Sequence, residues 1–200
     1  MRALPFLGVA ILGAVVGVTP NARAAVVLDQ QYLVTDGSYD AFTDGSGFQR
    51  AETFTVGVAG TLSEIDIFLV ATATFTGFNI LSTSAGVPTT VLTTGALLSS
   101  SSTEAAFTVS LPVTVGEVLA IEPVTSGQQL AWRAISSNTY AGGGDFYLNP
   151  PFGVNNFTSS GTGEDFQTFV TTPAAAPEPA SLLLLGPALV GMAALRRGRG

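Results

Sequence analysis

Between residues 25 and 171, short runs in which apolar and polar residues alternate recur about every dozen residues, and no stretch of useful length has a helical period. In the run 52–58, for example, Phe54, Val56 and Val58 alternate with small or polar residues. Alternation with period two is typical of strands that bury one face. The sequence therefore predicts an all-β fold.

Ten strands are expected, at residues 25–34, 52–58, 61–71, 78–82, 90–97, 106–111, 117–123, 130–135, 145–148 and 166–171. In the third run, Leu62 lies on the opposite parity from Ile65 and Ile67, so this strand is either buried on both faces or changes face at a bulge. Ten short strands separated by turn residues indicate a single β-sandwich or jelly-roll-like domain, which we place at residues 25–171.

The first 24 residues have the three parts of a secretory signal peptide. Arg2 precedes an apolar run over residues 4–18, and small side chains follow at Ala22 and Ala24. We expect a signal helix that signal peptidase removes by cutting between Ala24 and Ala25; the alternative is a buried N-terminal helix.

The last 29 residues divide into a spacer at 172–179, an uncharged apolar run at 180–195 and a basic tail at 196–200. A helix of the apolar run would be about 24 Å long, which crosses a bilayer with some thinning. The positive-inside rule places the basic tail in the cytoplasm and the preceding chain outside. The flanking cations are Arg196, Arg197 and Arg199.

Pro177, Glu178 and Pro179, followed by the apolar run and the arginine tail, resemble the PEP-CTERM sorting signal of Gram-negative bacteria. The resemblance implies recognition by an exosortase-type sorting enzyme and a link to extracellular polysaccharide. It also implies anchoring in the inner membrane, then residence at the cell surface or in the extracellular matrix. The alternative is a plain membrane anchor. The order of the strand motifs is also similar to a lectin-like sandwich domain that such surface proteins carry, with Phe152 and Phe157 where its members often have Trp.

Composition excludes several function classes. The chain has no Cys and no His, which removes thiol nucleophiles, Ser-His-Asp triads and most zinc, copper and haem sites. Between residues 25 and 177, Arg50 and Arg133 stand against 13 carboxylates, a formal charge of −11. Such a domain repels nucleic acid, whereas cations and neutral sugars remain suitable ligands.

Two loops are candidate ligand sites. Asp36, Asp40 and Asp44, interleaved with glycines, offer oxygen ligands for calcium, although the same pattern suits a solvated turn. In the loop 138–145, Tyr140 and Asp145 together with Trp132 could line a sugar groove. We favour the alternative, in which this loop covers one end of the sandwich and Trp132 belongs to the core.

The sequence thus predicts a non-enzymatic exported protein, structural or adhesive, whose partner is polysaccharide and which has no cofactor beyond a candidate calcium ion. One alternative is a calcium-dependent carbohydrate-binding module. The other is a glycan hydrolase that uses paired carboxylates, for which Glu64 with Asp66 and Glu164 with Asp165 are the candidates.

Overall fold

A computed structural model describes residues 23–33, 39–43, 49–125, 129–148 and 157–174 of the chain. These residues are built from strands and turns, without a helix, so the all-β prediction is confirmed. They fall almost entirely within one compact unit, Ala24–Pro173. The expected signal helix and membrane span lie outside the described residues.

Thirteen strands occur in the described part of the chain, where the sequence predicted ten. The three additional strands are β2, β11 and β12, of which the last two have only two residues each. The bounds are β1 (Ala25–Tyr32), β2 (Tyr39–Thr43), β3 (Gln49–Thr55), β4 (Gly60–Phe68), β5 (Phe75–Ser84), β6 (Val87–Ser100), β7 (Glu104–Val113), β8 (Val118–Thr125), β9 (Gln129–Ile135), β10 (Asp145–Leu148), β11 (Thr158–Ser159), β12 (Gly163–Glu164) and β13 (Phe166–Thr172).

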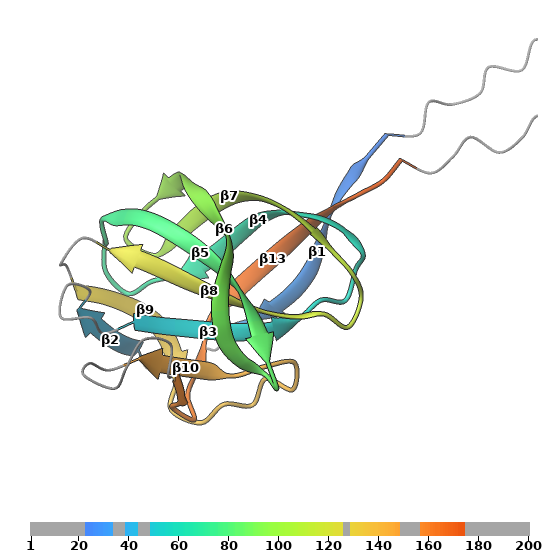
Figure 1. Ribbon diagram of the computed structural model, residues 1–200. Coiled ribbons are helices and arrows are strands. Elements are labelled where there is room, and N and C mark those ends of the chain that lie inside the picture. The colour runs from blue at the N-terminus through green and yellow to red at the C-terminus, as the bar shows by residue number, and fades with distance from the viewer. Residues whose placement is uncertain (1–22, 34–38, 44–48, 126–128, 149–156, 175–200) are drawn as a thin grey trace, which may run out of the picture. The chain divides into compact units, whose positions relative to one another are not determined.

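Ten of these strands form one antiparallel sheet in the order β1-β13-β4-β7-β6-β5-β8-β3-β10-β11, and β12-β9-β2 form a second, smaller sheet. The larger sheet curls around its own inner face (Figure 1). The long strand β6 connects the two halves of this sheet, because its residues 87–95 pair with β5 and its residues 96–100 pair with β7. Strands that pass from one layer to the other are how such corners are usually made.

The curling brings β1 against the segment that follows β3. Asp29 of β1 accepts hydrogen bonds from the backbone N–H groups of Gly57 and Val58, at 2.8 and 2.6 Å. Thr168 of β13 donates its hydroxyl to the same carboxylate at 3.3 Å. A carboxylate that accepts three donors in this way ties the first strand of the sheet to the eighth.

The inner face is filled by aromatic and branched side chains. Phe107 stacks on Phe78 with ring centroids 4.2 Å apart and meets the edge of Phe75 at 5.0 Å. Phe54 and Phe166 face each other at 6.0 Å from β3 and β13. Phe54, Phe78, Phe107 and Phe166 are fully buried, and each such ring contributes about 1.5–3 kcal/mol through burial.

The change of face expected in the third predicted strand occurs at a bulge. The register of β4 against β7 shifts between Leu62 and Glu64. As a result Leu62, Ile65 and Ile67 are all fully buried although they differ in parity. Of the two alternatives that the sequence left open, the structure selects the bulge.

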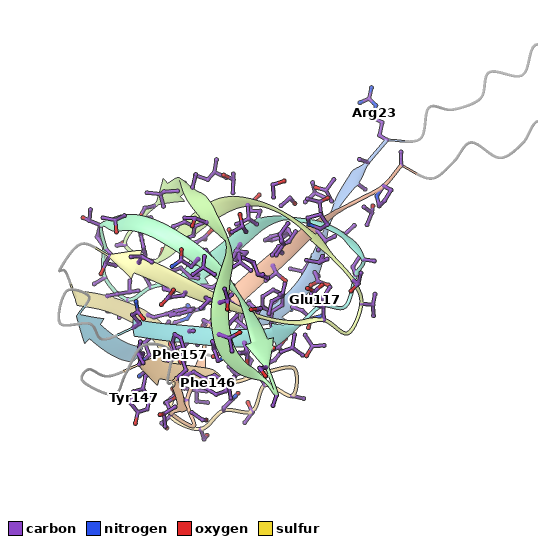
Figure 2. All side chains as sticks on the ribbon, in the orientation of Figure 1. Arg23, Glu117, Phe146, Tyr147 and Phe157 are labelled. Atoms are coloured by element: carbon purple, nitrogen blue, oxygen red, sulfur yellow. The ribbon has the colours of Figure 1, made fainter. Side chains whose placement is uncertain are left out.

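A smaller apolar cluster covers the outer face of β3. Ala51, Leu81 and Ala120 are buried there under Phe157, with Phe146 and Leu148 of β10 packed alongside. Figure 2 labels Phe157, Phe146 and Tyr147 in this part of the molecule. Strand β3 is therefore covered on both faces, and its inner face carries the polar site described next.

Candidate functional site: a buried acidic cluster

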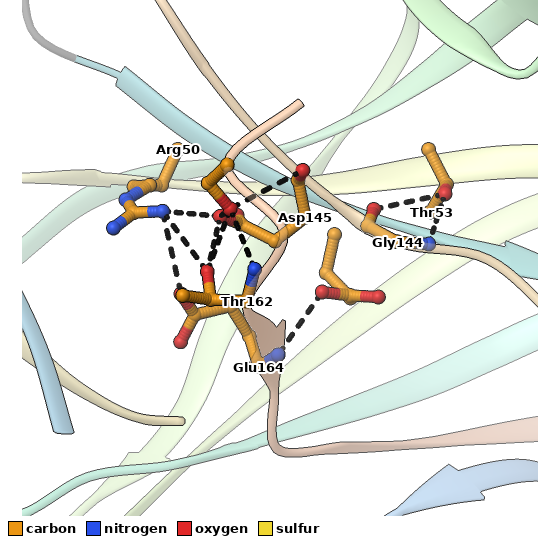
Figure 3. Close-up of polar contacts among 8 residues, drawn as sticks. Arg50, Thr53, Gly144, Asp145, Thr162 and Glu164 are labelled. Atoms are coloured by element: carbon orange, nitrogen blue, oxygen red, sulfur yellow. Dashed lines mark hydrogen bonds and ion pairs between the residues drawn. The ribbon is translucent and has the colours of Figure 1, made fainter. Parts of the chain in front are cut away.

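Three carboxyl groups and one guanidinium meet at one end of the inner face. We call Arg50, Glu52, Asp145 and Glu164 the acidic cluster, and Figure 3 labels all of them except Glu52. The three acidic residues are fully buried, and Arg50 is 6% exposed. Charged residues are seldom enclosed so completely unless they are paired, so this cluster is the most unusual chemical feature of the described residues.

Strand alternation explains how these residues reach the interior. Arg50 and Glu52 have the same parity as Phe54, so they lie on the core face of β3. Asp145 is directly opposite Glu52 in the pairing of β10 with β3, which places both on one face. Glu164 precedes Phe166 by two residues and, like that ring, is fully buried.

Hydrogen bonds converge on one oxygen of Asp145. Its Oδ2 accepts from the Arg50 guanidinium, from the Ser160 hydroxyl and, at 2.8 Å, from the Thr162 hydroxyl. The Arg50 guanidinium also lies 3.8 Å from Glu164 Oε1. On the other side of the cluster, the Glu164 backbone N–H donates to Glu52 Oε2 at 3.0 Å.

The cluster holds more acid than base. Within the described structure, Glu52 Oε1, Asp145 Oδ1 and both Glu164 carboxyl oxygens are buried without a hydrogen-bond partner. Burial raises the pKa of Glu52 and of Glu164 well above the usual value, and the negative charge of Asp145 adds to both effects. Burial also raises the pKa of Asp145, against the lowering effect of Arg50 and the two hydroxyls.

The second arginine of the domain forms a simpler pair. Arg133 donates through Nε to Asp165 Oδ2 and lies 5.0 Å from the ring centre of Phe68. The Arg133 side chain is 30% exposed, whereas that of Asp165 is fully buried. Both arginines of the domain are thus used to balance buried acids.

A further carboxyl lies on β4, two residues from Glu64. Asp66 is 7% exposed, and its Oδ1 is buried without a hydrogen-bond partner in the part that the structure describes. Burial, followed by the negative charges of Glu64 and Glu104, raises the pKa of Asp66 to about 6. The arrangement gathers the negative charges of Glu64, Asp66 and Glu104.

The residues predicted to line a sugar groove are mostly enclosed. Trp132 is fully buried and donates its indole N–H to the Asp165 carbonyl at 2.8 Å, which confirms its expected place in the core. Asp145 belongs to the acidic cluster. Tyr140 is half-buried, packs 5.4 Å from both Tyr32 and Phe166, and donates to Gln30 Oε1. Burial raises its pKa to about 12.

The predicted calcium loop falls largely outside the described residues, as Asp36 and Asp44 do. Asp40 is described through its backbone alone, which pairs with Trp132 in the register of β2 with β9. In the described ranges, no group of three acidic residues is arranged to hold a metal ion.

The terminal signals are also largely outside these ranges. Ala24 and Ala25 are described and exposed, and Ala25 begins β1. Residue Ala22, the Pro177, Glu178 and Pro179 motif and the three terminal arginines are not described. No helix in the described part is long and apolar enough to cross a membrane.

The chain matches no family model, no curated protein and no solved structure. The function must therefore be argued from the residues themselves.

Arg50 and Glu52 were not among the predicted site residues, and Glu164 was predicted only together with Asp165. The signal was nevertheless present, because Arg50 and Glu52 continue the inward parity of Phe54, and Glu164 continues that of Phe166. A charged residue at an inward position of a strand indicates a buried polar site.

Proposed function

We propose that this chain is an exported, surface-sorted protein of a Gram-negative bacterium. In this proposal the β-domain is a jelly-roll-like structural or adhesive module that associates with extracellular polysaccharide and does not transform it. The N-terminal signal directs export and the PEP-CTERM-like tail directs sorting to the surface, and the domain between them binds the polysaccharide.

The observation that best supports a non-enzymatic role is the burial of the acidic cluster. A glycan hydrolase needs two carboxyl groups that face a substrate from opposite sides of its scissile bond. Glu52, Asp145 and Glu164 are each 0% exposed, so a glycan reaches them only if the surrounding strands separate. Glu164 and Asp165, one of the candidate pairs, are divided between Arg50 and Arg133.

Export and sorting are tested by measuring the intact mass and the cell fraction of the protein in its native host, with and without the sorting enzyme. We expect a mature chain that begins at Ala25 and ends near Pro177, and that depends on the enzyme for its C-terminal end. A chain that keeps residues 180–200 whether or not the enzyme is present would overturn the sorting proposal.

Polysaccharide association is tested by co-sedimentation of the mature protein with polysaccharide purified from the same host. We expect binding that survives EDTA and leaves the number of reducing ends constant. Loss of binding in EDTA would favour the calcium-dependent module. Release of reducing ends by wild type but not by the E52Q and E164Q variants would favour a hydrolase, and absence of binding would leave a purely structural role.

A further inference from the structure

Residues 157–164, which we call the closing segment, are attached to the rest of the domain by few backbone pairs. β11 pairs with β10 through two residues, and β12 pairs with β9 through two residues. Two further backbone bonds join Ser160 to Asp145 and Asn138 to Gly161, at 3.1 and 2.9 Å. By comparison, β4 and β7 are joined through eight residue pairs.

Beside the packing of Phe157, the acidic cluster adds side-chain hydrogen bonds and an ion pair to this attachment. Ser160 and Thr162 of the closing segment donate their hydroxyls to Asp145 on β10. Glu164, its last residue, reaches Arg50 and Glu52 on β3 through its carboxyl and its backbone N–H. The charge state of these few groups therefore affects how firmly the closing segment is held.

The charges that face one another can be named for each packed element. β3 contributes Arg50 and Glu52, β10 contributes Asp145 and Tyr147, and the closing segment contributes Glu164. Nearby, the charge of Glu52 acts on Tyr140, and Asp165 is paired with Arg133. If Arg50 balances an ionised Asp145, the buried cluster is neutral only when Glu52 and Glu164 are both protonated.

We propose that Glu52 and Glu164 form the proton-binding pair of a pH-sensitive latch. While they are protonated, the closing segment stays on β3 and β10; when they ionise as the pH rises, the segment is released. Ionisation leaves two extra negative charges in a buried site whose one guanidinium is already paired with Asp145. The carboxylates then repel one another and are better solvated by water in the open form, so the open form is favoured.

The direction of the pH effect follows from linkage. Because burial raises the pKa of both groups in the closed form, the closed form binds more protons than the open one. The closed form is therefore most stable at acidic pH. It loses stability as the pH rises from the pKa values that Glu52 and Glu164 have in the open form towards their pKa values in the closed form. We call the equilibrium constant between the closed and the open form the opening constant. For each proton released on opening, this constant rises by about tenfold per pH unit.

Opening has a consequence for the surface. Phe157, at the start of the closing segment, covers Ala51, Leu81 and Ala120 on the outer face of β3 and is itself only 9% exposed. Release of the segment uncovers this apolar cluster. The latch thus links ambient pH to exposure of an apolar patch.

The test is amide hydrogen exchange on the full-length chain between pH 5 and pH 9, corrected for the intrinsic pH dependence of exchange. We expect the opening constant of residues 157–164 to rise by about tenfold or more per pH unit over part of this range. The Glu164 amide, which donates to Glu52, reports on the latch directly. Core amides such as Ile80 and Ile121 should keep their protection.

The decisive variants are E52Q and E164Q, which mimic the protonated acids. Each should reduce the pH dependence of opening, and the double variant should abolish it. E117Q is the matched control, because Glu117 caps a turn at Thr114 away from the cluster and its loss should leave the slope unchanged.

Three results would overturn the latch. The closing segment of the wild type could show an opening constant that does not change with pH, which requires no variant and stands even if a variant fails to fold. The core amides could lose protection in parallel with residues 157–164, which would indicate global unfolding. The glutamine variants could fold and retain the wild-type slope.

Discussion

Arg50 and Arg133 are the two cations of a domain with 13 carboxylates, and they are used in different ways. Arg133 is partly exposed and faces one buried carboxylate, Asp165, so charge is balanced one to one. Arg50 is nearly buried and faces Asp145 and Glu164, with Glu52 close by.

The comparison shows that pairing alone does not make a buried site neutral. The Arg133 pair needs no proton to be neutral, whereas the Arg50 cluster needs two. A site of the first kind is insensitive to pH in the neutral range, and a site of the second kind stores protons. The substitutions of Arg50 and Arg133 test this distinction; with two others, they follow in order of decreasing effect.

The largest effect is expected for Arg50→Met. The substitution leaves three buried carboxyls without a cation, and we expect it to lower the free energy of unfolding at pH 7 by about 3–5 kcal/mol. The loss should become smaller towards pH 5, because protonated carboxyls do not need the guanidinium. Urea unfolding at both values measures it, and a loss that is equal at the two pH values would contradict the proton-storage interpretation.

The next effect is expected for Gly143→Ala, which disturbs the approach of the loop before β10 to β3. A methyl group at Gly143 would lie 1.8 Å from the Thr53 carbonyl oxygen, so backbone must move. We expect a loss of about 2–3 kcal/mol in urea unfolding. The control is Gly144→Ala, whose added methyl would meet the Asn138 side-chain nitrogen at 3.0 Å and should cost less.

A smaller effect is expected for Arg133→Met. It removes the partner of Asp165 and the contact with the Phe68 ring, but the Arg133 side chain is 30% exposed and its ion pair is partly screened by water. We expect a loss of about 1–2 kcal/mol. If urea unfolding gives Arg133→Met the larger loss of the two arginine substitutions, the comparison between the sites is reversed.

The smallest effect is expected for Asp66→Asn. Because the folded pKa of Asp66 is raised to about 6, wild-type stability should fall as the pH rises from the unfolded value, 3.8, through 6. The asparagine variant lacks this fall and should be about 1 kcal/mol more stable at pH 7. Thermal unfolding from pH 4 to pH 8 measures both curves, and Glu104→Gln should shift the wild-type fall to lower pH.

Local pattern predicted much of the fold. Alternation in β3 predicted the buried Phe54, because alternation depends on neighbours in the chain. The break of parity in β4 allowed either burial on both faces or a bulge, and the structure has the bulge near Leu62. The order of strands in the sheet could not be read in this way. It depends on pairings such as Ala25 with Thr172, which are set by the packing of the whole chain.

The acidic cluster could be predicted only in part from the sequence. The inward parity of Glu52 and Glu164 was visible in the sequence, but their meeting depends on β12, a strand of two residues without a recognisable pattern. Because carboxylates outnumber arginines by 13 to 2 between residues 25 and 177, each acid also resembled an ordinary solvated side chain. Burial of Asp145 and Glu164 could be known only once β10 and β12 were placed.

The position of β13 has a mechanical consequence. This strand pairs with β1 on one side and with β4 on the other along most of its length, and it is the last strand before Pro173. A load applied to the chain beyond Pro173 enters the domain through β13 and is divided between two ladders of hydrogen bonds. A load applied ahead of Ala25 enters through β1, an edge strand that is held by a single ladder of backbone pairs and by the Asp29 side chain. The C-terminal end is the stronger of the two points of attachment.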